Sequence, residues 1–244
     1  MKHVIVCGAL GRMGSLVCQK LLSSDDLTLA ARVDVAGDGV EVLTDLNAFR
    51  GEAHILIDFS HHTAAPGIMA WAEEHQVAVI MCTTGHEPAE EAAIREAGRK
   101  IPVFYSANMS LGIALLAQLA KKTAALFPDA DIEIVEVHHN RKVDAPSGTA
   151  LMLFNAVKEV RPEAEANCGR AGEGKRTKNE IGISALRMGN VVGIHEVHIC
   201  TGTQTLTLKH EATTRAMLAD GAVDAARFMV GKAIGLYNME NILG

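Results

Sequence analysis

Paired cysteines are missing from this sequence of 244 residues. It has five cysteines, an odd number, and no two of them form a C-x-x-C pair. This scatter predicts neither a disulfide framework nor a zinc site, and we expect no bound metal. A reducing compartment fits this pattern, so we expect a cytoplasmic protein. The cysteines are Cys7, Cys18, Cys82, Cys168 and Cys200.

Long apolar runs and a large positive charge are also missing. No stretch of about twenty apolar residues is present, and the chain opens on a strand-like run where a signal peptide would stand. We therefore expect no membrane partner. Aromatic residues make up only 4% and the net charge is −6, which argues against nucleic acid as a partner. With 48% hydrophobic residues, the chain can fold as one large domain or two modest ones.

A glycine turn follows the first predicted strand, His3 to Cys7. It reads G-x-x-G-x-x-G from Gly8 to Gly14 and leads into a predicted helix. A second apolar run ends at Asp34. Its separation in sequence from the glycine turn is about that of the acidic residue that binds the adenosine ribose in dinucleotide-binding folds. Glycines let the backbone approach a pyrophosphate at a helix N-terminus, and Arg12 adds a cation there. The pattern predicts a dinucleotide site, with an ordinary turn of another α/β protein as the alternative.

Strands and helices then alternate. Strands are predicted over 53–58, 77–81 and 102–105, with helices over 63–75 and 88–100, so we expect a parallel sheet with right-handed crossovers. Short polar turns follow these strands at 58–60, 82–85 and 106–110. Ligands of such sheets bind beyond the carboxyl ends of the strands, so these turns outline one cleft.

The most chemically loaded stretch is 136–150, which reads EVHHNRKVDAPSGTA. An alternating apolar run before it predicts a strand, and a periodic run after it predicts a helix. Two imidazoles, two cations and a carboxylate thus stand before a helix N-terminus, which attracts anions. We expect an acidic substrate to be bound and protonated here. The alternative is a plain turn in which Ser147 or Thr149 only caps the helix.

The rest of the chain has a different character. A helix is predicted over 110–127, and consecutive strands over 181–187, 195–201 and 205–212 indicate a mixed or antiparallel sheet in a second domain. The glycine-rich basic segment 168–176 is either a surface loop or a lid. A final helix is predicted over about 219–235.

Taken together, these motifs resemble the 4-hydroxy-tetrahydrodipicolinate reductase family of diaminopimelate and lysine biosynthesis, over essentially the whole chain. The resemblance implies an α/β fold, with a Rossmann-type dinucleotide-binding domain of residues 1–109 plus 215–244. It implies a second α+β domain of residues 110–214 for substrate binding and tetramerisation. NADH or NADPH would be the cofactor, a small dicarboxylate the substrate, and a homotetramer the assembly.

The family's functional residues carry over by motif. His138 and Lys142 match the catalytic pair, with Lys142 as proton donor, and His139, Ser147, Gly148 and Thr149 match the substrate contacts. Leu10 and Cys82 depart from frequent glycines of the family without removing a polar group. The residues that match cofactor contacts are Gly8, Ala9, Leu10, Gly11, Arg12, Met13, Asp34, Cys82, Thr83, Thr84, Ser106, Ala107, Asn108 and Met109.

Asp34 also bears on the choice between the two cofactors. A carboxylate there accepts hydrogen bonds from a ribose 2′-hydroxyl and repels a 2′-phosphate, so we expect NADH to serve at least as well as NADPH. Two other functions stay open on the residues alone. One is an amino-acid dehydrogenase of similar architecture, for example one acting on aspartate. The other is a nucleotide-sensing protein that binds cofactor without turnover.

Overall fold

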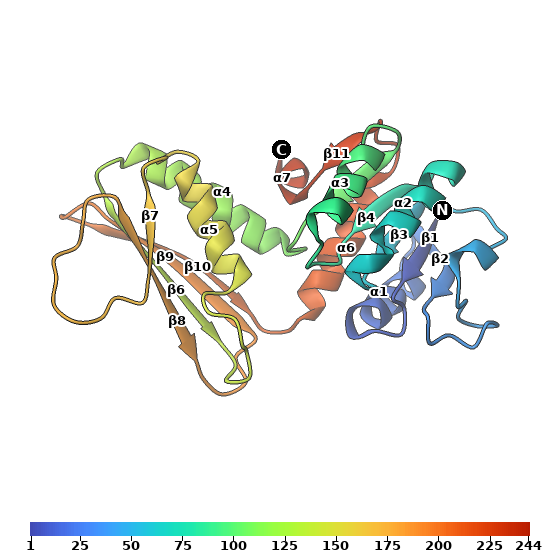
Figure 1. The fold of residues 1–244 in the computed structure, drawn as a ribbon, viewed down its shortest axis with the longest axis horizontal. Helices are drawn as coiled ribbons and strands as arrows, with labels where there is room; N and C mark the ends of the chain where they lie inside the picture. The colour runs from blue at the N-terminus through green and yellow to red at the C-terminus, as the bar shows by residue number, and fades with distance from the viewer. The chain divides into compact units, whose positions relative to one another are not determined.

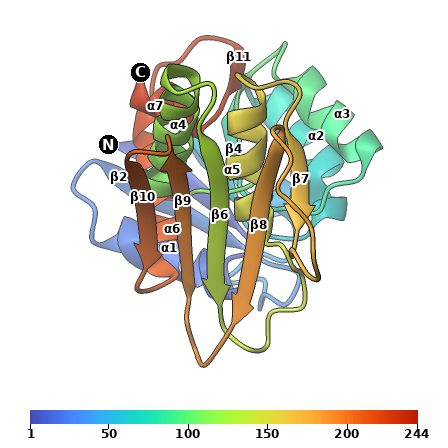
Figure 2. The same cartoon turned by 90° about the vertical axis from the view of Figure 1, so that its left-hand side faces the viewer.

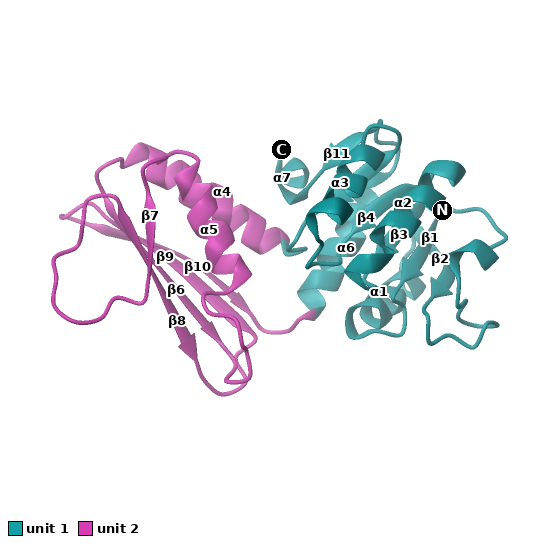
Figure 3. Cartoon of the chain, viewed as in Figure 1, with its two compact units in different colours: residues 1–110, 216–244 teal, residues 111–215 magenta.

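The computed structural model describes residues 1–244 as two compact units. Unit 1 comprises Met1–Ser110 and Ala216–Gly244, and unit 2 comprises Leu111–Arg215 (Figure 3). The second unit is thus an insertion into the first, and each has its own sheet.

Unit 1 is built on a parallel sheet with strand order β11-β5-β4-β3-β1-β2 (Figure 1). Its strands are β1 (Lys2–Cys7), β2 (Leu27–Val33), β3 (Ile55–Asp58), β4 (Ala78–Met81), β5 (Pro102–Tyr105) and β11 (Gly235–Tyr237). Its helices are α1 (Arg12–Leu22), α2 (Ala65–His75), α3 (Pro88–Ala97), α6 (Ala216–Met229) and α7 (Met239–Leu243), with short 3-10 turns η1 (Leu46–Ala48) and η2 (His62–Ala64).

The central strands of this sheet are buried on both sides, as expected when helices cover both faces of a parallel sheet. Ile55, Leu56 and Ile57 in β3 are each at most 1% exposed. The helix α1 packs against α6, and α2 packs against α3. Because every strand runs the same way, the turns that follow the strands gather at one edge.

Unit 2 is a five-stranded sheet with strand order β10-β9-β6-β8-β7. Strands β7 and β8 run parallel to β6, whereas β9 is antiparallel to both β6 and β10. The mixed sheet expected from consecutive strands is therefore present. Its elements are α4 (Leu111–Leu126), β6 (Asp131–His138), α5 (Gly148–Lys158), β7 (Glu165–Cys168), β8 (Glu180–Arg187), β9 (Gly193–Cys200) and β10 (Thr205–Ala212).

Only one face of the unit 2 sheet is covered by helices of the unit. Figure 2 shows α4 and α5 behind the five strands, with no element of unit 2 in front of them. Ile132 and Ile134 point to the covered face and are fully buried in a core with Leu153 and Phe154 of α5. The residues between them in the alternation, Glu133, Val135 and Val137, point to the other face and remain partly exposed, as the period of two in β6 requires.

Several predicted boundaries differ from the structure. The last predicted helix, 219–235, begins earlier and ends at Met229, and a turn at Gly231 leads to β11, which the sequence reasoning missed along with α7. The predicted helix 88–100 ends at Ala97. Cys168 belongs to β7, a strand of four mostly exposed residues that gave no apolar pattern.

No helix is both long and apolar enough to cross a membrane.

Candidate active site

A cavity of about 590 Å³ lies at the carboxyl edge of the unit 1 sheet. The turns after β1, β3, β4 and β5 all contribute to it, so the cleft predicted from the alternation of elements is present. Most of the residues expected to bind cofactor line it. The lining residues are Arg12, Met13, Phe59, Ser60, His61, His62, Cys82, Thr83, Thr84, Ala107, Asn108, Met109 and Leu218.

The glycines of the first turn are required by close backbone contacts. Gly8 has a φ of +72°, and a Cβ there would lie under 3.0 Å from the Phe59 carbonyl. A Cβ on Gly14 would strike the Gly8 carbonyl oxygen. The turn therefore holds bare backbone at the N-terminus of α1, the environment that a pyrophosphate needs. A dinucleotide fits this turn and the cavity beside it.

Asp34, at the end of β2, is tied directly to the glycine turn. Its Oδ2 accepts a hydrogen bond from the Leu10 amide at 3.0 Å, and its Oδ1 accepts one from the Ala36 amide at 3.0 Å. Arg32 pairs with Glu41 at 3.3 Å between Nη2 and Oε2. The carboxylate thus stands beside Leu10 without Arg32 as its partner. Gly8, Ala9 and Gly11 lie in the same turn.

A buried carboxylate organises the turn after β4. Asp58 is fully buried and accepts hydrogen bonds from the Thr83 hydroxyl at 2.6 Å and the Ser60 hydroxyl at 2.5 Å. Burial raises the pKa of this carboxyl above its ordinary value. Because Thr83 lines the cavity, Asp58 fixes the wall where Cys82 and Thr84 also stand. The Cys82 thiol is itself buried, which raises its pKa and makes it an inert wall.

The turn after β5 contains the remaining residues that were expected to contact the cofactor. Ser106 donates its hydroxyl proton to the Asn108 carbonyl at 2.8 Å, and the Ser110 amide donates to the Asn108 side chain at 2.9 Å. These bonds stiffen the turn. Ala107, Asn108 and Met109 line the cavity. Ser106 does not line it but holds the Asn108 carbonyl in place.

In unit 2, the predicted stretch 136–150 forms a polar cluster at the carboxyl end of β6. His138 is the last residue of this strand and is only 9% exposed. Its Nδ1 lies 2.5 Å from Oε2 of Glu136, which points to the same face of β6. The catalytic histidine expected from the sequence is therefore anchored on a rigid strand.

Arg187 completes this cluster from β8. Its two terminal nitrogens donate to the two oxygens of Glu136, at 2.9 and 2.8 Å. Nη2 also donates to the Asp144 carbonyl at 2.6 Å, which ties the loop after β6 to β8. Burial opposes the charged form of Glu136, but the bonds from Arg187 and His138 hold its pKa below the ordinary value.

The helix α5 begins with the cap that its sequence predicts. Ser147 accepts a hydrogen bond at its hydroxyl from the Ala150 amide at 3.2 Å, and its own amide donates to Glu136 at 3.0 Å. The same hydroxyl lies 3.2 Å from Nε2 of His195. Ser147 is 2% exposed, and both its hydroxyl and its amide have hydrogen-bond partners within the protein. Gly148 and Thr149 follow it in the first turn, where amides point away from the helix body.

The remaining two expected residues lie in the loop after β6. His139 accepts a hydrogen bond at Nε2 from Arg215 at 3.2 Å, and burial with Arg141 and Arg215 nearby lowers its pKa. Lys142 forms an ion pair with Asp144 at 2.8 Å, and its side chain is 21% exposed. Because Nε2 of His139 accepts this bond, its lone pair is directed at Arg215, and Lys142 lies in the same loop.

Sequence reasoning did not assign roles to Glu136, Arg187 or His195. Glu136 opened the stretch that was singled out, and it lies in phase with the apolar residues Ile132 and Ile134 of the same strand. Arg187 and His195 lie about fifty residues downstream, and only the pairing of β6 with β8 and β9 brings them together. A signal was present in the inward positions of these strands, where a polar residue interrupts an apolar series.

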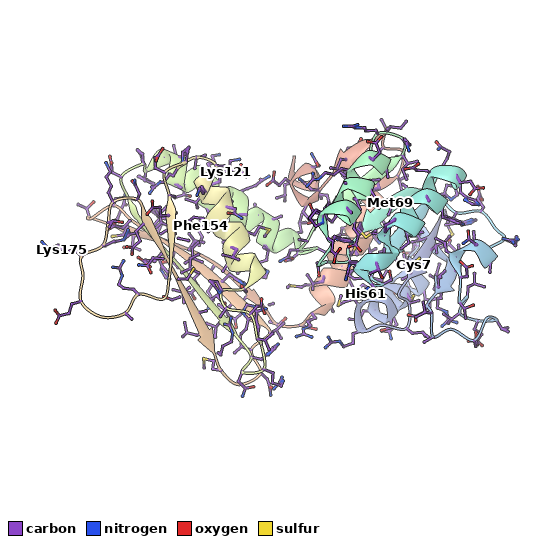
Figure 4. All side chains as sticks on the ribbon, in the orientation of Figure 1. Cys7, His61, Met69, Lys121, Phe154 and Lys175 are labelled. Atoms are coloured by element: carbon purple, nitrogen blue, oxygen red, sulfur yellow. The ribbon has the colours of Figure 1, made fainter.

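The basic segment 168–176 connects the parallel strands β7 and β8. Arg176 donates to the Ile132 and Glu180 carbonyls at 2.8 and 2.6 Å, and Arg170 pairs with Glu180. Lys175 extends from the outer part of this loop (Figure 4). The end of the segment is therefore fastened at the amino end of β6, whereas His138 stands at its carboxyl end.

One group of possible metal ligands lies elsewhere, at the amino edge of the unit 1 sheet. It consists of His3, Glu52 and His54. The His3 amide donates to Nδ1 of His54 at 3.2 Å, so the proton of this imidazole sits on Nε2, facing Glu52 at 3.5 Å. A metal ion at Nε2 would have to displace that proton. The three side chains contact one another directly, at 3.4 Å between His3 and Glu52 and at 3.5 Å between His54 and Glu52.

Comparison with known proteins places both units in one family. The family model described as dihydrodipicolinate reductase, N-terminus, matches residues 2–109, and the model of the C-terminus matches residues 112–243. A protein of Clostridium novyi (strain NT) named 4-hydroxy-tetrahydrodipicolinate reductase is 38% identical, covering 100% of this chain and 98% of the relative. A protein of the same name from Caldanaerobacter subterraneus subsp. tengcongensis is 40% identical over 100% and 98%.

A solved structure agrees in fold. The dipicolinate-bound dihydrodipicolinate reductase from Paenisporosarcina sp. TG-14 superimposes with a TM-score of 0.78, covering 99% of each chain at 21% identity. At that identity the likeness speaks for the fold.

Proposed function

Because the chain belongs to the dihydrodipicolinate reductase family, we propose that it reduces 4-hydroxy-tetrahydrodipicolinate to tetrahydrodipicolinate with NADH or NADPH. The family match extends over both units, and each unit contains one of the two groups of residues that the reaction needs. The reaction belongs to diaminopimelate and lysine biosynthesis. Unit 1 would serve the cofactor, and unit 2 the acidic substrate.

The cofactor would lie along the glycine turn and the cavity of unit 1. Bare backbone at Gly8 and Gly14 suits the pyrophosphate, Asp34 suits a ribose hydroxyl, and Arg12 adds a cation at the cavity wall. When bound, the reduced nicotinamide supplies a hydride. The turns at 82–84 and 106–109 would hold the nicotinamide end.

The substrate would bind at the N-terminus of α5. Its carboxylates suit the first turn of this helix at Gly148 and Thr149, where the helix dipole is positive, with Lys142 as a nearby cation. The neutral His139 offers a hydrogen bond beside them. Loss of the 4-hydroxyl group of the substrate as water gives a conjugated imine. Hydride addition to this imine leaves electron density that takes up a proton, and Lys142 would donate it while His138 assists.

The observation that carries this proposal is the cluster of His138, Glu136 and Lys142 beside the first turn of α5. A cofactor-sensing protein has no use for a buried, oriented imidazole and an acid beside an anion-binding turn. An aspartate dehydrogenase would take an amino acid and NAD⁺, and the family match argues against it.

A coupled assay tests the proposal. Pyruvate and aspartate semialdehyde, with the synthase that condenses them, generate the labile substrate while NAD(P)H absorbance is followed. We expect consumption of NADH that depends on the synthase. Turnover of aspartate with NAD⁺, with no consumption of NADH in the coupled assay, would replace the proposal with the dehydrogenase alternative.

A homotetramer built by unit 2 is part of the proposal. The uncovered face of its sheet carries partly exposed apolar side chains from three strands, Val135, Val137, Leu186 and Ile194. An open sheet face of this kind needs a cover, and an identical face from a second copy is the simplest one.

A further inference from the structure

We infer that Glu136 is the positioning residue of His138: it fixes which ring nitrogen carries the proton and presents the other nitrogen to the substrate. The inference rests on the proposed function, in which His138 acts at the substrate. It concerns a residue that touches neither substrate nor cofactor and works through the imidazole.

Glu136 has donors on every side. It is fully buried, and its two oxygens receive hydrogen bonds from the His138 ring, the Ser147 amide and both terminal nitrogens of Arg187. A protonated carboxyl would place an O–H against one of these donors. The group is therefore a carboxylate, and the fork of Arg187 balances its charge in the interior.

A carboxylate partner decides the tautomer of His138. Since Glu136 has no proton to give, the hydrogen bond at 2.5 Å requires the proton on Nδ1 of the ring. The neutral imidazole then carries its lone pair on Nε2, and the imidazolium carries a second proton there. In either state Nε2 is the atom that exchanges a proton with a ligand.

The surroundings of the ring preserve this orientation. Gly193 of β9 lies close to Nε2, and a Cβ at this position would be only 3.1 Å from that atom. The side of the ring that faces β9 is therefore open only because residue 193 is glycine. The His195 ring packs edge-on at 5.1 Å between centroids. Burial and the neighbouring His138 lower the pKa of His195 to about 4, so it adds no competing charge near neutral pH.

The same carboxylate also fixes the substrate end of α5. It accepts the Ser147 amide, and Arg187 in turn holds the Asp144 carbonyl, so the loop containing Lys142 is fastened at both ends. The charged or titratable groups around His138 include Glu136 on its own strand, Arg187 from β8 and His195 from β9, together with His139 and Lys142 from the loop that follows β6. Only Glu136 bonds the ring.

Glu136→Gln in the full chain is the test. Glutamine keeps the shape of the side chain but replaces one acceptor oxygen with an amide group that donates, so it no longer requires the ring proton on Nδ1. We expect the His138 nitrogen resonances, assigned by their loss in His138→Gln, to show a proton on Nδ1 in the wild type and a mixture of tautomers in the variant. We expect kcat to fall at least tenfold.

Three controls keep the outcome interpretable. Glu165→Gln removes the same charge from an exposed position of β7 and should match the wild type in every measurement. Glu136→Asp keeps the charge and should retain the wild-type tautomer, even if its turnover falls. NADH binding by calorimetry should be unchanged in all three variants, and if Glu136→Gln does not fold, the tautomer of the wild-type ring carries the test.

The inference is overturned if the wild-type ring carries its neutral proton on Nε2, or if Glu136→Gln leaves the His138 resonances unchanged. The nitrogen resonances are read without turnover. A wild-type protein with the predicted tautomer but no activity in the coupled assay would therefore refute the proposed function and leave the positioning role standing.

Discussion

Lys142 and Asp144 form an ion pair within a loop that is fastened at both ends, and this fixes where the ammonium group stands. If Lys142 donates the proton, Lys142→Met should lower kcat about a hundredfold, since a positioned acid contributes 10²–10⁴-fold. Steady-state kinetics in the coupled assay measure this. Lys178→Met, which removes an exposed ammonium paired with Asp129, is the matched control and should keep wild-type turnover.

Calorimetric titration with NADH separates chemistry from folding in the same variants. Both lysine variants should bind NADH like the wild type, because the glycine turn and Asp34 belong to unit 1. Normal turnover of Lys142→Met would assign the proton to another donor.

Asp34 makes a prediction about cofactor choice. Its carboxylate lies beside the Leu10 amide, and Arg32 is engaged with Glu41, so only Arg12 remains nearby to attract a 2′-phosphate. We expect the specificity constant for NADH to equal or exceed that for NADPH. A preference for NADPH beyond about tenfold, or about 1.4 kcal/mol, would show that Arg12 outweighs the carboxylate.

His195 predicts a pH dependence of stability. Its folded pKa of about 4 lies below its ordinary value of 6.5, so the unfolded chain takes up a proton first as the pH falls. The free energy of unfolding should therefore decrease between about pH 6.5 and pH 4, by an amount on the order of 3 kcal/mol from this group.

Urea unfolding at pH 7.5 and pH 5 measures this effect. His195→Gln can keep a hydrogen bond to Ser147 and has no proton to take up, so its stability should change less with pH than that of the wild type. If the free energy of unfolding changed by the same amount between the two pH values in both proteins, a residue other than His195 would be the titrating group.

The residues of the site were predictable to different degrees. His138 and Lys142 stand close together in sequence, in a stretch that no plain turn requires. Arg187 reads in sequence as an ordinary strand end, and its role depends on the register that sets it opposite His138. The inward direction of Glu136 follows from the period of two in β6, but its partner Arg187 comes from a strand pairing that no local pattern encodes.

At the scale of elements, the glycine turn between β1 and α1 makes a testable prediction. In Gly14→Ala the new methyl would collide with the Gly8 carbonyl, so the turn must shift away from the position that suits a pyrophosphate. We expect NADH affinity to fall at least tenfold and the melting temperature to decrease. Calorimetry and thermal unfolding measure the two effects.

Gly67→Ala is the contrasting substitution. Gly67 lies in α2 with nothing within 4 Å of its would-be Cβ, so alanine should stabilise the helix by about 0.5–1 kcal/mol. Cofactor binding should not change. Equal NADH affinity in Gly14→Ala and the wild type would mean that the turn does not hold the cofactor.

Long, strongly patterned elements were predictable, and short exposed ones were not. The strands of the parallel sheet are apolar runs between turn residues, so their positions and the edge where their turns meet could be predicted. β7 and β11 are four and three residues long and are only partly buried. Their pairing with β8 and β5 forms them, since they carry no apolar period of their own.

For the whole molecule, the uncovered face of the unit 2 sheet predicts assembly. Light scattering at micromolar concentration should give the mass of a tetramer, about four times 26.0 kDa. Val135→Lys places a charge in the middle of the face, so it should lower the mass while leaving the unit folded. A monomer mass for the wild type would contradict the proposal.

The insertion of unit 2 into unit 1 has a consequence for synthesis on the ribosome. Strands β1 to β5 emerge first, but α6, which packs on β3, β4 and β5, and β11, which pairs with β5, follow only after unit 2 has been made. Unit 2 is continuous in the chain and can complete its core during translation. The first part of unit 1 therefore waits for its final partners while unit 2 is made, with the α6 side of β3, β4 and β5 and the edge of β5 open to other chains in the meantime.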